Sequence, residues 1–596
     1  MAFDTVIRNG RWFDGTGAPS AVRNIGIRDG RVAAVTTDPI QGDETIEAGG
    51  KWVMPGMIDI HTHYDAEVLA GPALVESLRH GVTTIVMGSC SLSTVHVDAQ
   101  DAADLFGRVE AIPHEQVVRI VGEHKTWRTA EEYVAALESL PLGPNVTAFI
   151  GHSDIRAAVM GLDRATRKDM RPTRAEQARM ESMLDQALDA GFVGMSSQQL
   201  LFDKIDGDVC RSRTLPSTYA KGRELRRLKS RLRRRDRVLQ SGPDISHPHN
   251  IVSQALQSVG FGRPRLKTSL LAAADMKSTP GGMWLTVVLA AIANRLGGDF
   301  RFQHLPVPFE VYADGIDLVI FEEFGSGAAA LHLKTQLERN ELLRDEAYRR
   351  WFRKDYDNRW GPRAWHRDFF DAEIVACPDH TVVGKSFGDV GKERGEVHPV
   401  DAFLDLVLEH GAELRWRTTI SNHRPEMLRR LARMNGIQMG FSDAGAHMRN
   451  MAFYNFGLRL LRHVRDAQRS GEAFISTERA VHRLTGELAD WYRLDAGHLR
   501  VGDWADVVII DPERLDAALD GYHEAAADAY QGLQRMVNRN DDAVTAVLVA
   551  GRTVFSGGQP TALLGTHRTG CFLRADGRPR NIASRENAQQ PSATPA

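Results

Sequence analysis

The sequence predicts an α/β fold, a (β/α)8 TIM barrel with insertions plus a small β-sandwich formed from both termini. Three observations lead to this prediction. Helical segments that end at a glycine and lead into short apolar strands recur through the middle of the chain. Segments rich in β-forming residues and tight turns occur at both ends. The chain has 596 residues, which is too long for one small core.

The two ends of the chain are expected to pair into one composite domain. Three β-rich runs near the start are separated by Asn-Gly and Asp-Gly turns, and three more runs follow residue 506. These runs are Thr5–Arg8, Asn24–Ile27, Arg31–Val35, Val507–Ile510, Ala546–Val549 and Thr553–Phe555. Because the termini of a domain commonly lie close together, residues 1–53 and 497–577 are predicted to form the β-sandwich. The polar stretch 578–596 is expected to be a disordered tail.

The middle of the chain repeats a helix, a glycine and a strand. A capping box at Thr173–Glu176 opens a helix that Gly191 ends, and the strand Phe192–Met195 follows. Eight barrel strands are expected near residues 57–63, 82–87, 146–151, 192–196, 237–240, 265–270, 300–304 and 437–442. The barrel would occupy residues 54–496 and carry an insertion at about 325–398, which forms either a lid over the barrel mouth or an outer appendage.

Composition and charge exclude several classes of protein. The net charge of -3 gives no overall attraction to nucleic acid, and the basic run 223–237 has the leucine spacing of an outer barrel helix. No apolar stretch approaches the ~20 residues that span a bilayer. The four cysteines are scattered, without a CxxC pair, and no signal peptide is visible, so we expect a cytoplasmic protein. The expected partner is a small-molecule substrate, and a homo-oligomer is allowed.

Four potential metal ligands follow predicted barrel strands. His61 and His63 close the first strand, and their spacing places both side chains on one face. Cys90 follows the second strand, and Asp443 follows the last. Taken alone, Cys90 could be a small buried apolar residue and Asp443 a helix N-cap. Because all four positions fall at the carboxyl ends of strands, where barrel active sites lie, we predict that they converge.

This donor set predicts a zinc-dependent hydrolase. Imidazole, thiolate and carboxylate are common zinc ligands. A bound zinc lowers the pKa of a water from about 15.7 to about 7, and Asp443 can carry the proton from that water to a leaving nitrogen. The cofactor is therefore expected to be zinc, as one or two divalent ions.

Longer motifs give the chain a resemblance to a known family. They are Arg8–Gly17, Pro55–His63, Gly81–Cys90, Gly151–Gly161, Ser442–Asp443 and Gly502–Asp506. With these motifs the chain resembles the amidohydrolase superfamily, in its branch of N-acyl-D-amino-acid deacylases (D-aminoacylases). The resemblance implies a metal-bearing barrel, hydrolysis of a linear amide, Cys90 at the place of a carboxylated lysine, and Asp443 as general acid/base and ligand of a weaker metal.

The sequence departs from this branch at two strands. The branch also has a histidine at the end of strand five and another at strand six, whereas neither predicted strand carries one here. His247, His249 and Asp275 lie just beyond these strands and are candidate substitutes, although each could be an ordinary loop residue. The metal site is therefore expected on His61, His63, Cys90 and Asp443 or a subset of them, unless it has been rebuilt or lost.

The remaining candidates concern the substrate. His152 could orient a substrate carbonyl or be a core histidine with satisfied hydrogen bonds. Arg156, Lys277, His447 and Arg449 are candidates to bind a substrate carboxylate. The leading hypothesis is a metal-dependent amidohydrolase that deacylates an N-acyl (D-)amino acid. The alternatives are a cyclic-amide or amidine hydrolase, or a catalytically inactive relative retained for binding or assembly.

Overall fold

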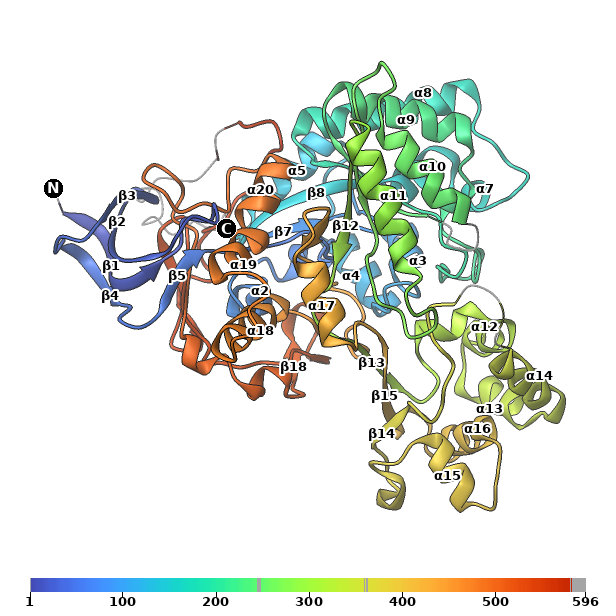
Figure 1. The fold of residues 1–596 in the computed structure, drawn as a ribbon. Helices are drawn as coiled ribbons and strands as arrows, with labels where there is room; N and C mark the ends of the chain where they lie inside the picture. The colour runs from blue at the N-terminus through green and yellow to red at the C-terminus, as the bar shows by residue number, and fades with distance from the viewer. Residues whose placement is uncertain (1, 244–247, 359, 361–362, 579, 581–596) are drawn as a thin grey trace, which may run out of the picture.

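A parallel sheet of eight strands forms the centre of this computed structural model, which describes residues 2–243, 248–358, 360, 363–578 and 580 (Figure 1). The strands lie in chain order, so each pairs with the next. They are β6 (Met57–Asp59), β7 (Val82–Met87), β8 (Asn145–Gly151), β9 (Gly194–Gln198), β10 (Val238–Gly242), β11 (Lys267–Leu270), β12 (Asp299–His304) and β16 (Ile437–Met439). All eight predicted barrel strands are present, and the predicted fold class is confirmed.

The first and last strands close the sheet on itself. The amide of Ile60 donates to the carbonyl of Gly440 (3.2 Å), and Asp443 N–H donates to the carbonyl of His61 (3.1 Å). A parallel bridge joins Thr62 to Ala444. These contacts bring the segment after β6 beside the segment after β16, although nearly 400 residues separate them in sequence.

Helices surround the barrel and cover its apolar strands (Figure 1). They are α1 (Glu67–Ala70), α2 (Val75–Arg79), α3 (Ala99–Phe106), α4 (His114–His124), α5 (Ala130–Ser139), α6 (His152–Met160), α7 (Leu162–Ala165), α8 (Arg174–Ala190), α9 (Gly222–Arg234), α10 (Pro248–Ser258), α11 (Met283–Arg295), α17 (Pro425–Ala432), α18 (Phe456–Arg469), α19 (Thr477–Leu484) and α20 (Gly486–Tyr492). The predicted capping box at Thr173 opens α8, and Gly191 ends it with a positive φ of 104°.

The basic run forms α9, and its arginines pair with the neighbouring helix. Arg227 and Arg231 contact Glu181 of α8, and Arg231 and Arg235 contact Asp185. The apolar face of α9 buries Leu228 and Leu232. Three arginines of the run are thus paired with carboxylates of α8, which agrees with an outer barrel helix.

Strands from both chain ends share one nine-stranded sheet. They are β1 (Phe3–Trp12), β2 (Ala21–Arg28), β3 (Arg31–Thr36), β4 (Gly42–Glu47), β5 (Trp52–Pro55), β17 (Val507–Ile510), β20 (Val544–Val549), β21 (Arg552–Ser556) and β22 (Gln559–Pro560). The two halves meet where β5 pairs antiparallel with β17. A separate hairpin joins β18 (Glu524–Ala527) to β19 (Leu533–Met536). Of the predicted tail, the structure describes Arg578 and Arg580, and Arg580 is buried against Asp506.

A separate unit with its own core lies between β12 and β16, at the lower right of Figure 1. It contains a three-stranded sheet, β13 (Phe309–Asp314), β15 (Arg415–Ser421) and β14 (Glu373–Ala376), and the helices α12 (Gly325–His332), α13 (Gln336–Arg344), α14 (Glu346–Asp357), α15 (Phe387–Glu393) and α16 (Pro399–His410). The insertion unit is wider than the stretch 325–398, because β13 and β15 form its base.

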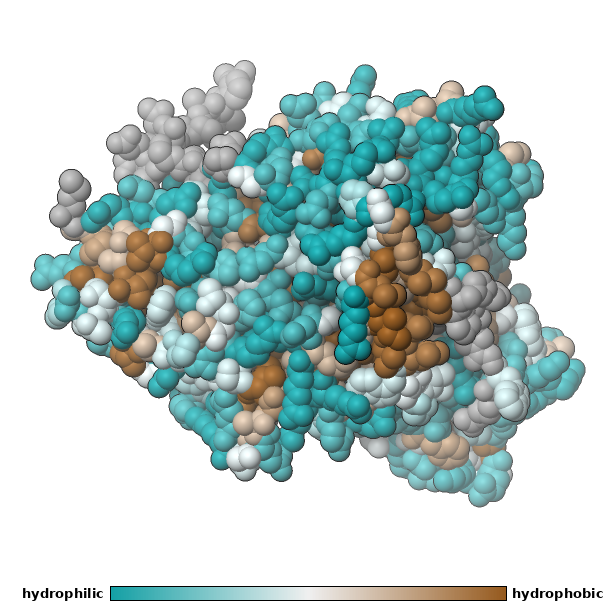
Figure 2. Space-filling model, turned by 45° about the horizontal axis from the view of Figure 1, so that its top comes forward, coloured by the Kyte–Doolittle hydropathy of each residue, from teal (hydrophilic) through white to brown (hydrophobic). Residues whose placement is uncertain are grey.

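The surface is mostly hydrophilic, with local apolar areas (Figure 2). Four apolar side chains are exposed by 45 to 62% along one stripe of α11: Leu285, Val288, Ile292 and Leu296 just beyond its end. Such stripes are often buried by another protein, although homo-oligomerisation stays a prediction here. Among the described residues, none of the helices has the length and apolar character of a membrane span.

Candidate metal centre

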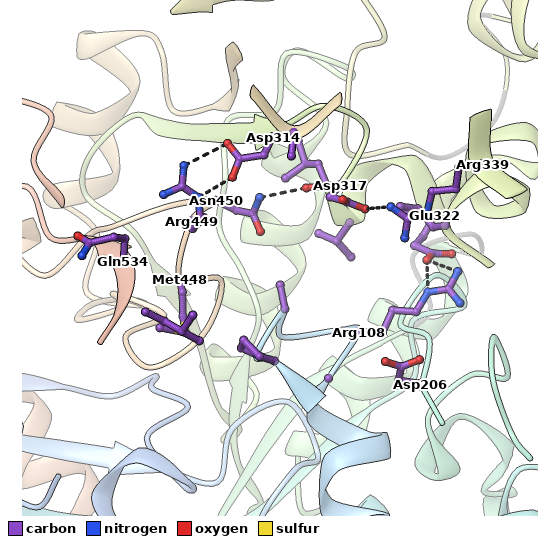
Figure 3. Close-up of a pocket in the computed structure, with 18 of the residues that line it drawn as sticks. Arg108, Asp206, Asp314, Asp317, Glu322, Arg339, Met448, Arg449, Asn450 and Gln534 are labelled. Carbon is purple, nitrogen blue, oxygen red and sulfur yellow. Dashed lines mark hydrogen bonds and ion pairs between the residues drawn. The ribbon is translucent and has the colours of Figure 1, made fainter. Parts of the chain in front are cut away.

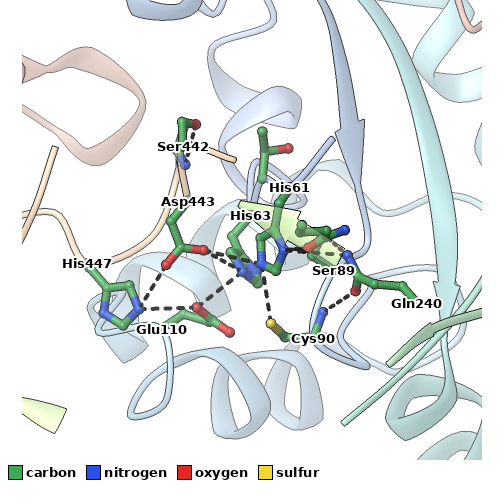
Figure 4. Close-up of polar contacts among 12 residues, drawn as sticks. His61, His63, Ser89, Cys90, Glu110, Gln240, Ser442, Asp443 and His447 are labelled. Carbon is green, nitrogen blue, oxygen red and sulfur yellow. Dashed lines mark hydrogen bonds and ion pairs between the residues drawn. The ribbon is translucent and has the colours of Figure 1, made fainter. Parts of the chain in front are cut away.

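Four of the predicted ligands lie together at the carboxyl ends of the barrel strands (Figure 4). The Sγ of Cys90 is 3.3 Å from Nε2 of His61. The Oδ1 of Asp443 is 3.4 Å from Nε2 of His61 and 3.2 Å from Nε2 of His63. The side chain of Asp443 is 12% exposed, whereas those of both histidines are 1% exposed. The structure thus brings together the four residues expected to converge, while their role as ligands stays a prediction.

The local backbone fixes these side chains. Cys90 and Asp443 have positive φ values of 52° and 60°, which turn the chain sharply after β7 and β16. The carboxylate of Asp59, at the end of β6, accepts hydrogen bonds from the amides of His61 (3.2 Å) and Ser442 (3.3 Å). One buried carboxylate therefore holds the turn before the first histidine against the turn before Asp443.

Gln303 determines which ring nitrogen of His61 faces the centre, and Gln240 orients the neighbouring loop. Nδ1 of His61 lies 2.7 Å from Oε1 of Gln303, so it donates a hydrogen bond and leaves the lone pair on Nε2. Gln240, on β10, accepts from the amide of Cys90 (2.9 Å) and donates to Ser89 (3.1 Å). Strand five, where the branch has a histidine, therefore presents an amide that orients its neighbours.

Glu110 and His447 complete the cluster. Oε2 of Glu110 lies 3.4 Å from Nε2 of His63 and 3.6 Å from Nε2 of His447, and His447 lies 3.7 Å from Oδ2 of Asp443. Sequence reasoning missed Glu110, because it lies in an irregular loop after α3 without a motif. His447, which was predicted to bind substrate, lies within this cluster.

Burial and charge shift the pKa values of the histidines in opposite directions. Burial lowers the pKa of His61 to about 4, against the opposing attraction of Asp443. Burial also lowers the pKa of His447 to about 4. The pKa of His63 is raised to about 9, because the carboxylates of Glu110 and Asp443 outweigh its burial. His61 and His447 are therefore neutral at pH 7, and positive charge is stabilised at His63.

The acidic groups respond to the same surroundings. Burial opposes ionisation of Asp443, but hydrogen bonding and attraction from His63, followed by His61, hold its pKa below the ordinary value. Burial raises the pKa of Glu110 to about 8. Burial also raises the pKa of the Cys90 thiol well above its usual value, with a further contribution from the negative charges of Glu110 and Asp443.

The cluster has the donors that a divalent cation requires. The described residues contain two sets of donors, and within each set the ligand atoms lie within 4.8 Å of one another. One set is His61, His63 and Cys90, and the other is His63, Glu110 and Asp443. Both ring nitrogens of His63 are buried without a hydrogen bond of good geometry. Because buried polar atoms are normally paired, these unsatisfied nitrogens fit a bound metal.

Two residues predicted to bind substrate, both on α6, lie in a buried network with Glu224 of α9. His152 contacts Ser197 (3.0 Å) and Glu224 (2.9 Å), and the guanidinium of Arg156 also pairs with Glu224. Both side chains are fully buried. Arg156, which was expected to bind a substrate carboxylate, is thus already paired with a carboxylate of α9.

Other predicted residues also lie apart from the centre. Lys277 pairs with Asp371 (2.5 Å) in a separate cavity of about 350 Å³, whose wall also includes Arg424. Asp275 is buried and accepts a hydrogen bond from Nε of Arg424 (2.7 Å), so its carboxylate is already paired. His247 and the side chain of His249 fall outside the described residues.

A cavity of about 440 Å³ is lined in part by the loops that carry Glu110 and His447 (Figure 3). Its wall includes Ala111 and Met448, the residues that follow Glu110 and His447 in sequence. The cavity lies between the barrel loops and the insertion unit, and its charged side chains pair across it. Arg108 contacts Glu322 (2.5 Å), and Arg449 contacts Asp314 (2.5 Å). Arg449 thus lines this cavity, but with its charge matched by a carboxylate.

Sequence comparison agrees with the geometry of the centre. The model of the amidohydrolase family matches residues 44–234, which include His61, His63 and Cys90. The chain is 55% identical over 567 residues to an uncharacterized protein of Mycobacterium tuberculosis, covering 94% of this chain and 93% of that protein. N-acyl-D-glutamate deacylase of Alcaligenes xylosoxydans xylosoxydans is 34% identical over 195 residues, or 33% of this chain and 37% of the enzyme.

The chain belongs to the amidohydrolase superfamily. Its likeness to the deacylases confirms the D-aminoacylase-like branch predicted from the motifs, and it identifies a hydrolase of carbon–nitrogen bonds other than peptide bonds. The fold is similar to that of N-acyl-D-glutamate deacylase from Bordetella bronchiseptica complexed with zinc, with a TM-score of 0.64 and 24% identity over 96% of this chain and 100% of that one. A D-aminoacylase structure gives a TM-score of 0.62 at 20% identity, with the same coverage. Family and fold together support metal-dependent amide hydrolysis.

Proposed function

We propose that this protein is a zinc-dependent deacylase that hydrolyses the linear amide of an N-acyl D-amino acid. The observation that carries the proposal is the grouping of His61, His63, Cys90 and Asp443 at the barrel mouth. The likeness to N-acyl-D-glutamate and N-acyl-D-aspartate deacylases, at 34% and 32% identity over a third of the chain, supports the substrate class.

His61, His63 and Cys90 would hold the metal, with Asp443 beside it. When bound, a zinc ion would polarise the amide carbonyl and make a water more acidic. His61 presents Nε2 as a lone-pair donor, because its Nδ1–H is held by Gln303. Buried surroundings exclude bulk water from all of these groups except Asp443, which is the most exposed.

Asp443 is the group placed to move the proton. Its carboxylate is ionised at neutral pH, because its pKa is held below the ordinary value by His63 and His61. It can therefore accept a proton from the attacking water. It can then deliver that proton to the leaving nitrogen, which is far more basic and needs a proton to depart as an amine.

The cavity beside Glu110 and His447 would receive the rest of the substrate. At about 440 Å³ it has the size of a small-molecule site. Its charged side chains suit a polar substrate rather than a long apolar chain. A paired arginine such as Arg449 could exchange its partner for a substrate carboxylate, at the cost of the contact to Asp314.

The test is a substrate panel with the zinc-loaded protein. We expect release of the free amino acid from N-acetyl and N-formyl D-amino acids, including the glutamate and aspartate derivatives, and no turnover of hydantoins. Asp443→Asn should lower turnover by about 10²- to 10⁴-fold. The control is Asp208→Asn, which removes an 86% exposed carboxylate near the cavity and should retain activity.

Two results would count against this function. Turnover of cyclic amides or amidines alone would assign the site to the other substrate class of the superfamily. A zinc-loaded, folded protein that hydrolyses none of these compounds would favour an inactive relative, in agreement with the missing histidines of strands five and six.

A further inference from the structure

Helix α11 presents an apolar stripe to solvent on the outside of the barrel. Its side chains Leu285, Val288 and Ile292 are each about half exposed, and Leu296 continues the stripe just beyond the helix. The spacing of three, four and four residues places these side chains along one line of the helix surface. Figure 2 shows a broad apolar area at the place of α11. Because soluble proteins rarely leave such a continuous apolar area uncovered, the stripe indicates a binding surface.

The chain itself has little left that could cover this stripe. Trp284, at the edge of the stripe, is already covered by Arg430 of α17, whose guanidinium carbon lies 3.9 Å from the ring centroid. Outside the described residues, the sequence contains Met1, Ile245 and Ile582 as its large aliphatic side chains. Three scattered residues in otherwise polar segments cannot bury a line of four apolar side chains. The occupant of the stripe must therefore come from another molecule.

The stripe is complementary to a second copy of itself. When two α11 helices pair antiparallel about a two-fold axis between Val288 and Ile292, these two residues face each other across the axis. In the same arrangement Leu285 of each copy faces Leu296 of the other. Each contact thus joins two large apolar side chains of similar size. Because no residue from 278 to 294 is charged, no like charges meet along the stripe.

The first charged residue at the end of the stripe favours the antiparallel orientation. In a parallel pair of helices the two Arg295 side chains would lie side by side and repel each other. In the antiparallel pair they lie at opposite ends of the contact, about 14 Å apart along the axis at the helical rise of about 1.5 Å per residue.

The area of the stripe is that of an interface core. At roughly 100 Å² for each half-exposed side chain, the stripe supplies about 400 Å² per copy, or about half of what each partner contributes to a standard interface. The apolar core of an interface is normally surrounded by a polar rim, which supplies the remaining area. The stripe therefore provides enough apolar surface for the centre of a dimer contact.

We propose that two copies of this protein form a two-fold symmetric dimer through α11, with the two helices antiparallel and the stripe from Leu285 to Leu296 at the core of the contact. The same surface is used by both copies, so the assembly closes at two subunits. None of the residues of the stripe belongs to the candidate metal centre, so the dimer does not depend on the proposed function.

The first experiment is sedimentation equilibrium of the full-length protein at about 1–100 μM, a range in which micromolar dissociation is visible. Wild type should reach twice the chain mass of 66.1 kDa. Ile292→Glu buries an unpaired carboxylate in the contact and should raise the dissociation constant by at least about 100-fold, and Val288→Lys should do the same. The control is Leu337→Glu, which changes a 69% exposed leucine of α13 and should dimerise like wild type. Circular dichroism shows whether each variant is folded.

Cysteine cross-linking tests the antiparallel geometry. All four native cysteines are buried, so mild oxidation reports on the introduced thiols. Ile292→Cys would lie about 5 Å along the axis from its copy, within reach of a disulfide, and should give a cross-linked dimer. Leu285→Cys would lie about 16 Å from its copy and should not cross-link. The double variant Leu285→Cys/Leu296→Cys should cross-link, because each cysteine faces the other type across the axis.

Three results would overturn this inference, and none of them alters the proposed function. A folded wild type that stays monomeric at every concentration excludes self-association and assigns the stripe to a different partner. A dimer that both charged variants leave unchanged places the contact on another surface. Cross-linking of Leu285→Cys alone, at the same rate as Ile292→Cys, excludes the antiparallel arrangement.

Discussion

Replacing Glu224 by glutamine tests whether Arg156 belongs to the core or to the substrate site. Glu224 is 4% exposed and lies between His152 and Arg156, both of which are fully buried. Although burial opposes its ionisation, the hydrogen bond and charge of His152, with Arg156, lower its pKa from 4.5 to about 2. A shift of that size corresponds to about 3 kcal/mol of stability at neutral pH. This figure already includes the attraction to Arg156, which Glu224→Gln would leave buried without a counter-ion.

The assay is thermal unfolding of wild type and Glu224→Gln. For 596 residues the unfolding entropy is about 1.2 kcal/mol/K, so a loss of 3 kcal/mol lowers Tm by about 3 °C. A carboxylate with a lowered pKa contributes above its unfolded value of 4.5 and loses that contribution as the pH falls toward 2. The difference between the two proteins should therefore be full at pH 7 and shrink below about pH 4.5.

The control is Glu123→Gln, which removes a 54% exposed partner of Arg119 and should change stability by under about 0.5 kcal/mol. The reasoning is refuted if Glu224→Gln has the same Tm as wild type while the KM for a confirmed substrate changes. That outcome would return Arg156 to substrate binding.

Three further changes have defined outcomes. Burial raises the pKa of Glu323 from 4.5 to about 7, so the wild type loses stability as the pH rises from 4.5 to 7. Above pH 7, Glu323→Gln should be more stable than wild type by up to about 3 kcal/mol. A stability difference between the two proteins that is the same at pH 4 and pH 8 would contradict this. Burial lowers the pKa of Lys229 from 10.5 to about 8, so the charged amine destabilises the folded protein at pH 7. Lys229→Met should stabilise the protein at pH 7 by about 2 kcal/mol, a value that allows for the lost hydrogen bond to Gln257. The gain should vanish above about pH 10.5, where the lysine is neutral in both states. Phe403, stacked on Phe369 in the insertion unit at 4.7 Å, is fully buried, and Phe403→Ala should destabilise that unit by about 3–5 kcal/mol without changing the metal content.

The sequence was sufficient for the barrel because its signals are local. Helix α8, for example, ends at Gly191, and strand β9 begins at Gly194. His61 and His63 could be placed on one face because strand geometry fixes a spacing of two. Cys90 and Asp443 could be placed near them because parallel strands end at the same side of a barrel.

The rest of the site depends on contacts that no local pattern encodes. Glu110 reaches His63 from an irregular loop, and its position depends on the backbone hydrogen bond from His447. An arginine that binds substrate and one that is buried look alike in sequence. Arg156 is assigned to the core only when Glu224, 68 residues later, is seen beside it. The insertion was predicted at about 325–398, and the pairing of β13 with β15, about 100 residues apart, has no local signal in the sequence.

The most direct test of the metal centre is elemental analysis of purified full-length protein compared with its Cys90→Ala and His61→Asn variants. If the cluster at the barrel mouth is a metal centre, the wild type contains at least one equivalent of zinc or a similar divalent metal, and both folded variants bind it far more weakly. A folded wild type that takes up no divalent metal, even when zinc is supplied during expression and refilling, would contradict the account.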